Sequence, residues 1–513
     1  MKFKIETLLA SSNIAELLEE KDLEGIGQEV CDGYELDKRS RDGWEQKIED
    51  WTRLALQVAE TKTSPWVGAA NVKYPLITNA ALQFSARAYP ALLTGPNVVR
   101  GRVIGFDEDG SKLDKAVRIG KHMSYQLMEE MEDWEEQMDK LLFSLPIVGC
   151  MFKKTYFDSV KNLNVSEIVY PKELVVNYYA TSLEDAERIT HVLKFTENDL
   201  RERVASEIFL DQVLDKPVTQ TNSVSNQATG VTQPPNDKTV PYEILEQCCY
   251  LDLDEDGYKE PYIVTVDSMT RKVLRIVARF SEEAIDYNKK VIVRIKPDHY
   301  YTKYSFIPSP DGGFYDIGFG ILLGPINDTV NTLINQLLDS GTLNNMQSGF
   351  ISKGIRIKGG NKPFTKGEWK YVNSPGDDLR KGIVPLPTKE PSQVLFSLLG
   401  MMVDAGEKLS SSTDMMSGQI PGQNTKATVA MAAIDQGMKV FKSIYKRIHR
   451  SLSKEFKKLY YLNSLFLEDE QYFAVLDVGQ EEAKKILRSD YSDKTDVVPA
   501  SDPNVATEEQ KMA

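Results

Sequence analysis

Two acidic clusters contain the side chains in this sequence that could do chemistry. In the first, Asp252, Asp254 and Asp256 precede Gly257, which is the spacing that opens a calcium-binding loop. The twelfth position of that pattern needs a bidentate glutamate, but here it is Ile263, and strand-like segments flank the loop in place of helices. The sequence therefore favours a turn between two strands at this position, and it predicts no metal site.

The second cluster lies at the junction of two predicted helices, 111–131 and 134–145. It consists of Glu129, Glu130, Glu132, Asp133, Glu135 and Glu136. Consecutive acidic residues point in different directions on a helix and usually form a solvated face. One alternative nevertheless stays open, which is a metal-dependent DNA-modifying enzyme that uses either acidic cluster.

Other signatures of catalysis are missing from the sequence. There is no GxxxxGK[ST] segment, so the chain is not expected to be an ATP-driven motor. The four histidines lie far apart, and none belongs to an HExxH motif. The four cysteines, two of them adjacent, suit neither a disulfide framework nor a zinc site. We expect a protein without enzymatic activity and without a cofactor.

Composition places the chain among soluble globular proteins, with 41% hydrophobic and 27% charged residues. A length of 513 residues predicts several subdomains. No apolar run reaches membrane-spanning length, and acidic residues near the N-terminus argue against a secretory signal, so we expect the protein in the cytoplasm where it is made. The net charge of −14 implies that any contact with DNA is local or weak.

The elements that would position functional residues are clearest from residue 315 to residue 463. A helix is predicted from Pro325 to about Asn345, with apolar residues on one face. Its opposite stripe is polar and almost free of positive charge, which predicts a solvent-exposed surface that does not bind anions. The main residues of this stripe are Asp328, Asn331, Asn335 and Asp339.

A small β region is predicted next, at residues 348–390, because short strand-like runs alternate with glycine and proline. It is strongly basic, and the charges could be a solvated surface or a contact for phosphate or a protein partner. Its basic residues are Lys353, Arg356, Lys358, Lys362, Lys366, Lys370, Arg380 and Lys381.

A second helix is predicted from Pro391, and it has no charged side chain before Asp404. Such a helix must be covered on most sides, either by a neighbouring subunit or by an ordinary domain core. A polar loop follows to Lys426, and then a long amphipathic, basic helix over 427–463 with Gly437 as its expected point of bending.

The remainder of the chain mixes both kinds of element, which predicts an α+β fold. Helices are expected within 1–62 and at 76–93, and a helix capped by Thr196 is expected to follow residue 195. Residues 216–241 are polar and are expected to be flexible, and residues after Val478 are expected to be loop-like. Strands are expected at 98–106, 148–157, 163–170, 190–195, 242–253, 258–266, 273–280 and 291–296.

This order of elements resembles the portal proteins of tailed bacteriophages, in particular the larger podovirus type. The segments that carry the resemblance are GCMFKKTYFD (149–158), GFGILLGPINDTVNTLINQLLDSGTLNN (318–345) and MMSGQIPGQNTKATVAMAAIDQG (415–437). The resemblance implies a portal fold with an α/β wing, two stem helices, a small β clip, a tunnel loop and a long kinked helix. The implied boundaries are wing 1–317, first stem helix 318–347, clip 348–390, second stem helix 391–412, tunnel loop 413–426, long wing helix 427–463, and wing return with the start of a crown 464–513.

The resemblance also implies a function, which is a ring-shaped channel at one capsid vertex for packaging and ejection of double-stranded DNA. Expected partners are further copies in a ring of about twelve, DNA in transit, the terminase large subunit, a head-to-tail adaptor, and the major capsid and scaffolding proteins, with no membrane. The expected location is the virion, after assembly in the host cytoplasm. The basic clip residues would dock partners, and the loop residues Met415, Met416, Gln419, Gln423, Asn424, Thr425 and Lys426 would face DNA. Besides the enzyme, a soluble adaptor that binds proteins through the basic helix stays open as an alternative.

Overall fold

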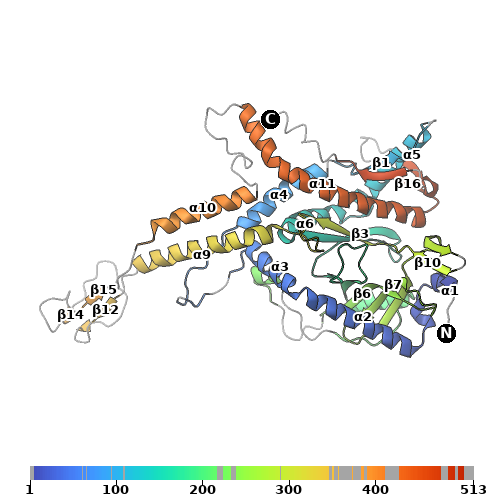
Figure 1. Cartoon of the computed structure of the whole chain (residues 1–513), viewed down its shortest axis with the longest axis horizontal. Coiled ribbons are helices and arrows are strands. Elements are labelled where there is room, and N and C mark those ends of the chain that lie inside the picture. Colours follow the sequence, from blue (N-terminus) through green and yellow to red (C-terminus); the bar gives the residue numbers. More distant parts are fainter. Residues whose placement is uncertain are drawn as a thin grey trace.

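The computed structural model describes residues 5–59, 62–64, 66–93, 95–107, 110–216, 223–232, 239–288, 291–345, 349–351, 356–357, 372–373, 383–385, 390–410, 427–474, 483–491 and 495–501. It has a mixed α and β body from which a pair of helices projects, with short strands at the far tip of the pair (Figure 1). The α+β prediction is confirmed. None of the described helices has the length and apolar character needed to cross a membrane.

The N-terminal part of the body is helical, as predicted. The buried residues of α3 are Ile48, Trp51 and Ala55, whose spacing puts them on one face of the helix. These elements are α1 Ile5–Ala10, η1 Ile14–Leu17, α2 Glu20–Ser40, α3 Asp42–Ala55, α4 Leu76–Leu92, α5 Ser111–Tyr125, η2 Gln126–Glu130 and α6 Trp134–Val148.

Two antiparallel sheets form the centre of the body. A five-stranded sheet has the order β4-β5-β6-β7-β8, and a three-stranded sheet has the order β11-β2-β3. Their strands are β2 Cys150–Asp158, β3 Leu163–Val169, β4 Leu174–Val176, β5 Ile189–Phe195, β6 Tyr242–Leu251, β7 Glu260–Asp267, β8 Val273–Ala278 and β11 Tyr301–Ser305. A separate hairpin pairs β9 Ile285–Asn288 with β10 Val291–Ile295, after η3 Glu282–Ala284.

Two helices lie in the connections of these sheets. The capping box predicted at Thr196 is present at the start of α7, Glu197–Ala205, where the Thr196 side chain accepts from the Asp199 backbone. By contrast, Asp133 precedes α6 without a side-chain cap. The predicted flexible loop 216–241 contains α8, Val224–Thr229, and lies partly outside the described residues.

The two ends of the chain meet in the body. β1 Val99–Val103 pairs with β18 Thr495–Pro499, and β16 Glu470–Ala474 pairs with β17 Ala483–Leu487. A short 3-10 helix, η5 Arg488–Asp490, follows β17 directly. The prediction that residues after Val478 are loop-like is therefore wrong, because β17 and β18 are ladder strands whose partners supply their hydrogen bonds.

The long helix α11, Ala427–Phe466, packs across the body from Phe441 onwards and contributes to the main hydrophobic core (Figure 1). The predicted apolar stripe is buried there, at Phe441, Tyr445, Ile448, Leu452, Phe456 and Leu459. The helix is continuous through Gly437, and the expected bend at this residue stays a prediction.

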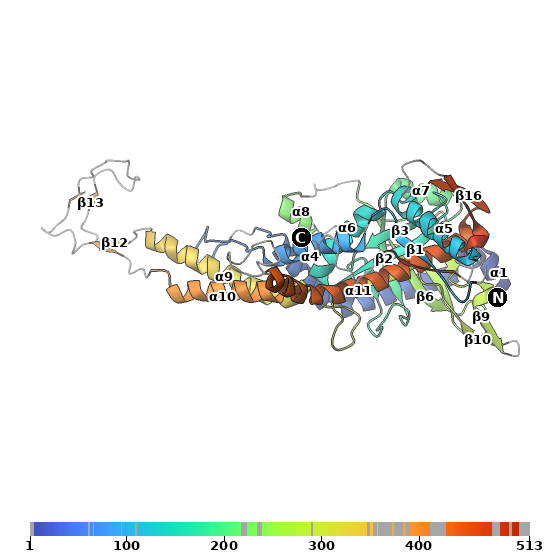
Figure 2. The ribbon, with the colours of Figure 1, turned by 90° about the horizontal axis from the view of Figure 1, so that it is seen from above.

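The projecting pair consists of α9, Phe319–Asn345, and α10, Gln393–Leu409, which run side by side (Figures 1 and 2). The first helix begins six residues earlier than predicted, so Pro325 lies inside it and not at its first position. The strands at the tip pair as β12 Gly349–Ile351 with β15 Ile383–Pro385, and β13 Arg356–Ile357 with β14 Val372–Asn373.

Three sets of predicted positions lie outside the described residues. They are the whole predicted tunnel loop 413–426, the basic β-region residues other than Arg356, and the C-terminal segment 502–513.

Candidate interface surfaces of the projecting helices and the body

The polar stripe of α9 holds an extended segment of the chain, residues 69–75, against the helix. Three backbone N–H groups of this segment, each two residues from the next, donate to side chains of α9 that are four residues apart. The pairs are Ala70 to Asp339 Oδ1 at 2.8 Å, Val72 to Asn335 Oδ1 at 2.7 Å, and Tyr74 to Asn331 Oδ1 at 2.7 Å. Asn335 also donates through Nδ2 to the Val72 carbonyl at 3.1 Å. We call these four bonds the amide ladder.

The register of the amide ladder follows from chain geometry. Four residues of a helix rise about 6 Å, and two residues of an extended chain advance about 6.5 Å. Side chains at a four-residue spacing can therefore meet every second N–H group of an antiparallel extended segment. The segment has no regular secondary structure of its own, so these bonds satisfy backbone groups that would otherwise be unpaired.

The prediction that this stripe is a wet surface is largely wrong. Asn331 and Asn335 are buried, Asp339 is half-buried, and of the four predicted residues only Asp328 is exposed. The four-residue spacing was visible in the sequence. Nothing in the sequence paired it with a segment more than 250 residues away.

The second helix of the pair exposes apolar side chains. Val394 is 75% exposed, Phe396 is 61% exposed and Met401 is 68% exposed. From Gln393 to Leu409 the single buried residue is Gly406, and a Cβ atom there would lie 2.7 Å from Leu76 Cδ2 of α4. The helix therefore packs along α9 and touches α4 of the body near its C-terminal end, while the described residues of the chain leave Val394, Phe396 and Met401 largely exposed.

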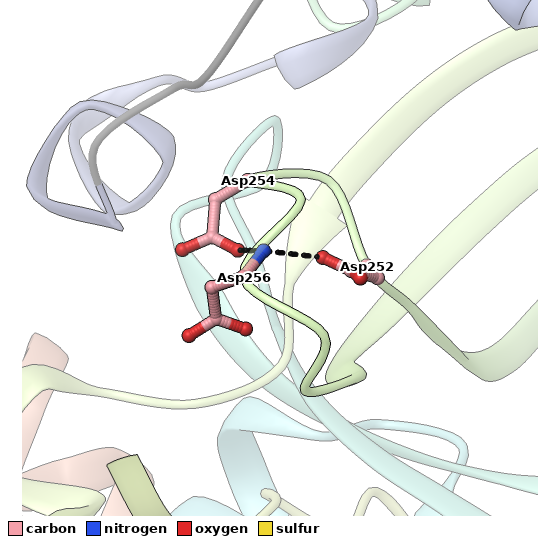
Figure 3. Close-up of side chains that lie close together, drawn as sticks. All are labelled: Asp252, Asp254 and Asp256. Carbon is pink, nitrogen blue, oxygen red and sulfur yellow. Dashed lines mark hydrogen bonds between the residues drawn. The ribbon is translucent and has the colours of Figure 1, made fainter. Parts of the chain in front are cut away.

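The first acidic cluster lies on the loop between β6 and β7 (Figure 3). One ligand oxygen from each of Asp252, Asp254 and Asp256 lies within 4.8 Å of the others. The Asp256 N–H donates to Asp252 Oδ1 at 3.2 Å and to Asp254 Oδ1 at 3.1 Å. Among the described residues, this is the one group of three or more carboxylate, histidine or cysteine ligands close enough to hold a metal ion.

The second acidic cluster does not form a common site. Gln471 Nε2 donates to Glu130 at 3.0 Å, Tyr89 donates to Glu135, and Lys140 forms an ion pair with Glu136. These three carboxylates therefore have three separate partners, as expected for a helical junction.

The cysteines and two of the histidines are buried parts of the body. All four cysteines are free and buried, and burial raises the pKa of Cys31 to about 11 and that of Cys150 to about 12. Burial lowers the pKa of His122 to about 4 and that of His191 to about 3. Thiols and imidazoles held neutral in this way are structural groups.

Three lysines near the C-terminal end of α11 make contacts within the chain. Lys454 forms an ion pair with Glu184 at 3.0 Å, and Lys457 forms one with Asp496 at 3.3 Å. Lys458 Nζ donates to Thr302 Oγ1 at 2.9 Å. These contacts attach the helix to the body.

Comparison with known proteins gives one family. The family model of the phage SU10 portal protein matches residues 112–498, which extends from α5 through β18 and includes the projecting helices. No curated protein sequence matches the chain.

Proposed function

The chain belongs to the phage SU10 portal protein family, and from this premise we propose that its two projecting helices are stem helices that line a DNA channel in a ring of identical subunits. Portal proteins are structural proteins, and membership of the family implies a ring oligomer in the head-to-tail connector at the portal vertex of the virion. To this family-level description the proposal adds a central channel, the helices that line it and the passage of DNA through it.

The observation that carries the proposal is the exposed apolar face of α10. A helix that leaves Val394, Phe396 and Met401 in water is costly to a monomer, because burial of each such side chain stabilises by about 1.5–3 kcal/mol. A ring supplies a neighbour at the same place on every subunit. We therefore propose that the occupant of this face is a second copy of the chain.

The charges of the stem suit a conduit for DNA. The two helices carry one basic residue, Lys408, against four acidic residues, Asp328, Asp339, Asp404 and Glu407. Each phosphate that a protein neutralises adds salt-dependent affinity. A wall almost free of lysine and arginine would let the DNA backbone pass without holding it.

We assign the remaining regions on the same basis. Residues 1–317 form the wing together with the long helix 427–463 and the return 464–513, which includes the start of a crown; 348–390 form the clip and 413–426 the tunnel loop. The basic clip residues would dock the terminase during packaging and the head-to-tail adaptor afterwards, and the tunnel loop would meet DNA at the narrowest part of the channel. Capsid and scaffolding proteins would contact the wing.

Imaging and native mass measurement of the purified chain test the proposal. We expect rings with a central hole and a mass of about twelve subunits. Phe396→Glu should abolish these rings, because it places a charge in the proposed subunit contact, while the circular dichroism spectrum of the subunit stays unchanged.

Leu36→Glu is the matched control, because Leu36 on α2 is 57% exposed and lies on the wing. It should assemble as the wild type does. A wild type that stays monomeric, or a Phe396→Glu variant that still forms rings, would overturn the assignment of α10 as the subunit contact.

A further inference from the structure

A cavity lies between the two sheets of the wing and the C-terminal end of α11. Its volume is about 430 Å³, which is within the range of cavities that bind ligands. Residues of β2, β6, β7 and β8 line one side, and the last turns of α11 line the other. The cavity forms where three elements that are distant in sequence meet, so no local pattern in the sequence predicts it.

Two basic residues that line the cavity have no carboxylate partner among the described residues. Arg275 of β8 donates only to the Ser12 carbonyl, from Nε and from Nη2 at 3.4 Å each. Lys458 of α11 donates to Thr302 Oγ1 at 2.9 Å and to the Tyr301 carbonyl. Burial lowers the pKa of Lys458 to about 8. Cations that are partly removed from water without a compensating charge favour the binding of an anion.

The other charged groups on the lining leave this excess of positive charge in place. Lys154 Nζ forms an ion pair with Glu246 Oε1 at 2.7 Å, so these two charges compensate each other. The further carboxylate on the described lining is Asp298, and the cations of Arg279 and Lys296 act on it from outside the cavity. The cavity therefore has room in its charge balance for one more carboxylate.

The cavity has an apolar rim on α11 where it opens to solvent. Tyr461 is 43% exposed, and Leu465 and Phe466 are each 48% exposed. The ring of Phe466 stacks on that of Phe157 of β2 with a distance of 4.3 Å between the ring centroids, which fixes its position. The rim thus offers a contact surface for an aromatic side chain next to the basic groups.

A second cavity continues from the first along α11. Its volume is about 770 Å³, and it shares Asp298, His299, Lys458 and Tyr461 with the first cavity. A ligand held at these residues can therefore extend from one cavity into the other. This arrangement favours a peptide, whose chain can run on past the site, over a small molecule that is enclosed on all sides.

We propose that this cleft of the wing binds a peptide segment of a partner protein in which an acidic residue lies next to an aromatic one. Arg275 and Lys458 hold the carboxylate, because a guanidinium binds a carboxylate through two parallel hydrogen bonds and an ammonium adds a second positive charge. The aromatic side chain lies on the rim, against Tyr461 and Leu465. The site is independent of how the stem assembles.

Calorimetric titration of the full-length chain with a synthetic peptide tests the proposal. The probe is a short peptide with blocked ends, in which phenylalanine and glutamate are adjacent and the other residues are glycine and serine. We expect a Kd of about 10–100 µM, the affinity of a ligand that makes contact through about twenty heavy atoms. The same peptide with glutamine in place of glutamate should bind about tenfold more weakly, because it lacks the charge that the two cations compensate.

Four variants separate the charge of the cleft from its apolar rim. Arg275→Gln and Lys458→Gln each remove one cation from the cleft, and each should weaken binding of the glutamate peptide by about tenfold. Lys272→Gln is the matched control, because Lys272 is an exposed cation directly before β8 that does not line the cavity, and it should bind the peptide as the wild type does. Leu465→Gln should weaken the binding of both peptides, because it makes the rim polar.

Thermal unfolding shows whether the variants fold. Arg275→Gln and Lys458→Gln leave no buried carboxylate without its partner, so both should melt close to the wild type. No binding of the glutamate peptide by the wild type at about 1 mM, ten times the weakest expected Kd, would overturn the proposal, as would equal binding of the two peptides. Equal binding by the wild type and both cation variants would contradict it as well. Tighter binding of deoxyadenosine monophosphate than of the peptide would replace the peptide by a nucleotide and so refute the proposal.

Discussion

The wing and the stem differ in how they accommodate unfavourable groups, namely buried charges and exposed apolar side chains. In the wing, Glu455 of α11 is fully buried, and both oxygens of its carboxylate accept hydrogen bonds from side chains of the same chain. In the stem, Phe396 of α10 is 61% exposed and no described residue covers it. The wing is thus closed by one chain, whereas the stem leaves large apolar side chains exposed, and this difference is the reason for proposing that the stem is the part that needs its neighbours.

The Glu455 network explains how a single chain closes the wing. Lys153 Nζ and Trp134 Nε1 each donate to Glu455 Oε1 at 2.9 Å, Ser166 Oγ donates to it at 2.7 Å, and the Tyr304 hydroxyl donates to Oε2. Burial alone would raise the pKa of Glu455, but Lys153 and the hydrogen-bond donors lower it overall, so the carboxylate stays ionised. The network joins α6, β2, β3 and β11 to α11.

Removing the Glu455 carboxylate should have the largest effect on the wing. Glu455→Ala leaves Lys153 buried and unpaired, and it should reduce the free energy of unfolding by about 3–5 kcal/mol. The measurement is urea denaturation followed by tryptophan fluorescence, since Trp134 lies in the network. The double variant Glu455→Leu with Lys153→Met should recover most of the loss, and a single variant as stable as the wild type would contradict a closed wing.

The helix α9 tests the comparison within one element, because its base packs against the wing and its outer end projects away from it. A Cβ atom at Gly320 would lie 2.4 Å from Cδ2 of Trp51, whereas one at Gly341 would meet nothing within 4 Å. Gly320→Ala should therefore cost about 1–3 kcal/mol through overpacking. Gly341→Ala should be neutral or stabilise by up to about 1 kcal/mol. Thermal unfolding of both variants measures the contrast, and equal effects would show that the two ends of α9 are not packed differently.

The amide ladder is the place where wing and stem are joined by hydrogen bonds. Asn335→Ala removes the partner of both the N–H and the carbonyl of Val72, and it should cost about 1–3 kcal/mol. Gln336→Ala, an exposed neighbour on the same helix, should stay within about 0.5 kcal/mol of the wild type. Proteolysis within residues 69–75 is a second measurement, because loss of the ladder should expose this segment to cleavage.

The sequence predicted patterns that lie within one element and missed those that join distant elements. The buried stripe of α11 was correct because a helical repeat from Phe441 to Leu459 is local information. The polar stripe of α9 was misinterpreted because Asn331 and Asn335 look the same in a sequence whether they meet water or a backbone. Glu455 resembled any other charge on an amphipathic helix. Likewise β18 was missed because its partner β1 lies almost 400 residues earlier.

Proton uptake should weaken the wing without changing the stem. His122 is fully buried, with Nδ1 2.5 Å from the Tyr491 hydroxyl, and burial lowers its pKa to about 4 from an ordinary value of 6.5. The unfolded chain therefore binds a proton at His122 as the pH falls through 6.5 while the folded chain does not, so stability is lost in that direction, by about 0.8 kcal/mol for this residue at pH 6. The Tm should fall from pH 8 to pH 6, and His122→Gln should flatten the slope of Tm against pH.

The mass of the rings over the same pH range should stay constant, because α9 and α10 contain no histidine. Rings that dissociate along with the loss of wing stability would show that the wing, and not the stem, holds the assembly together.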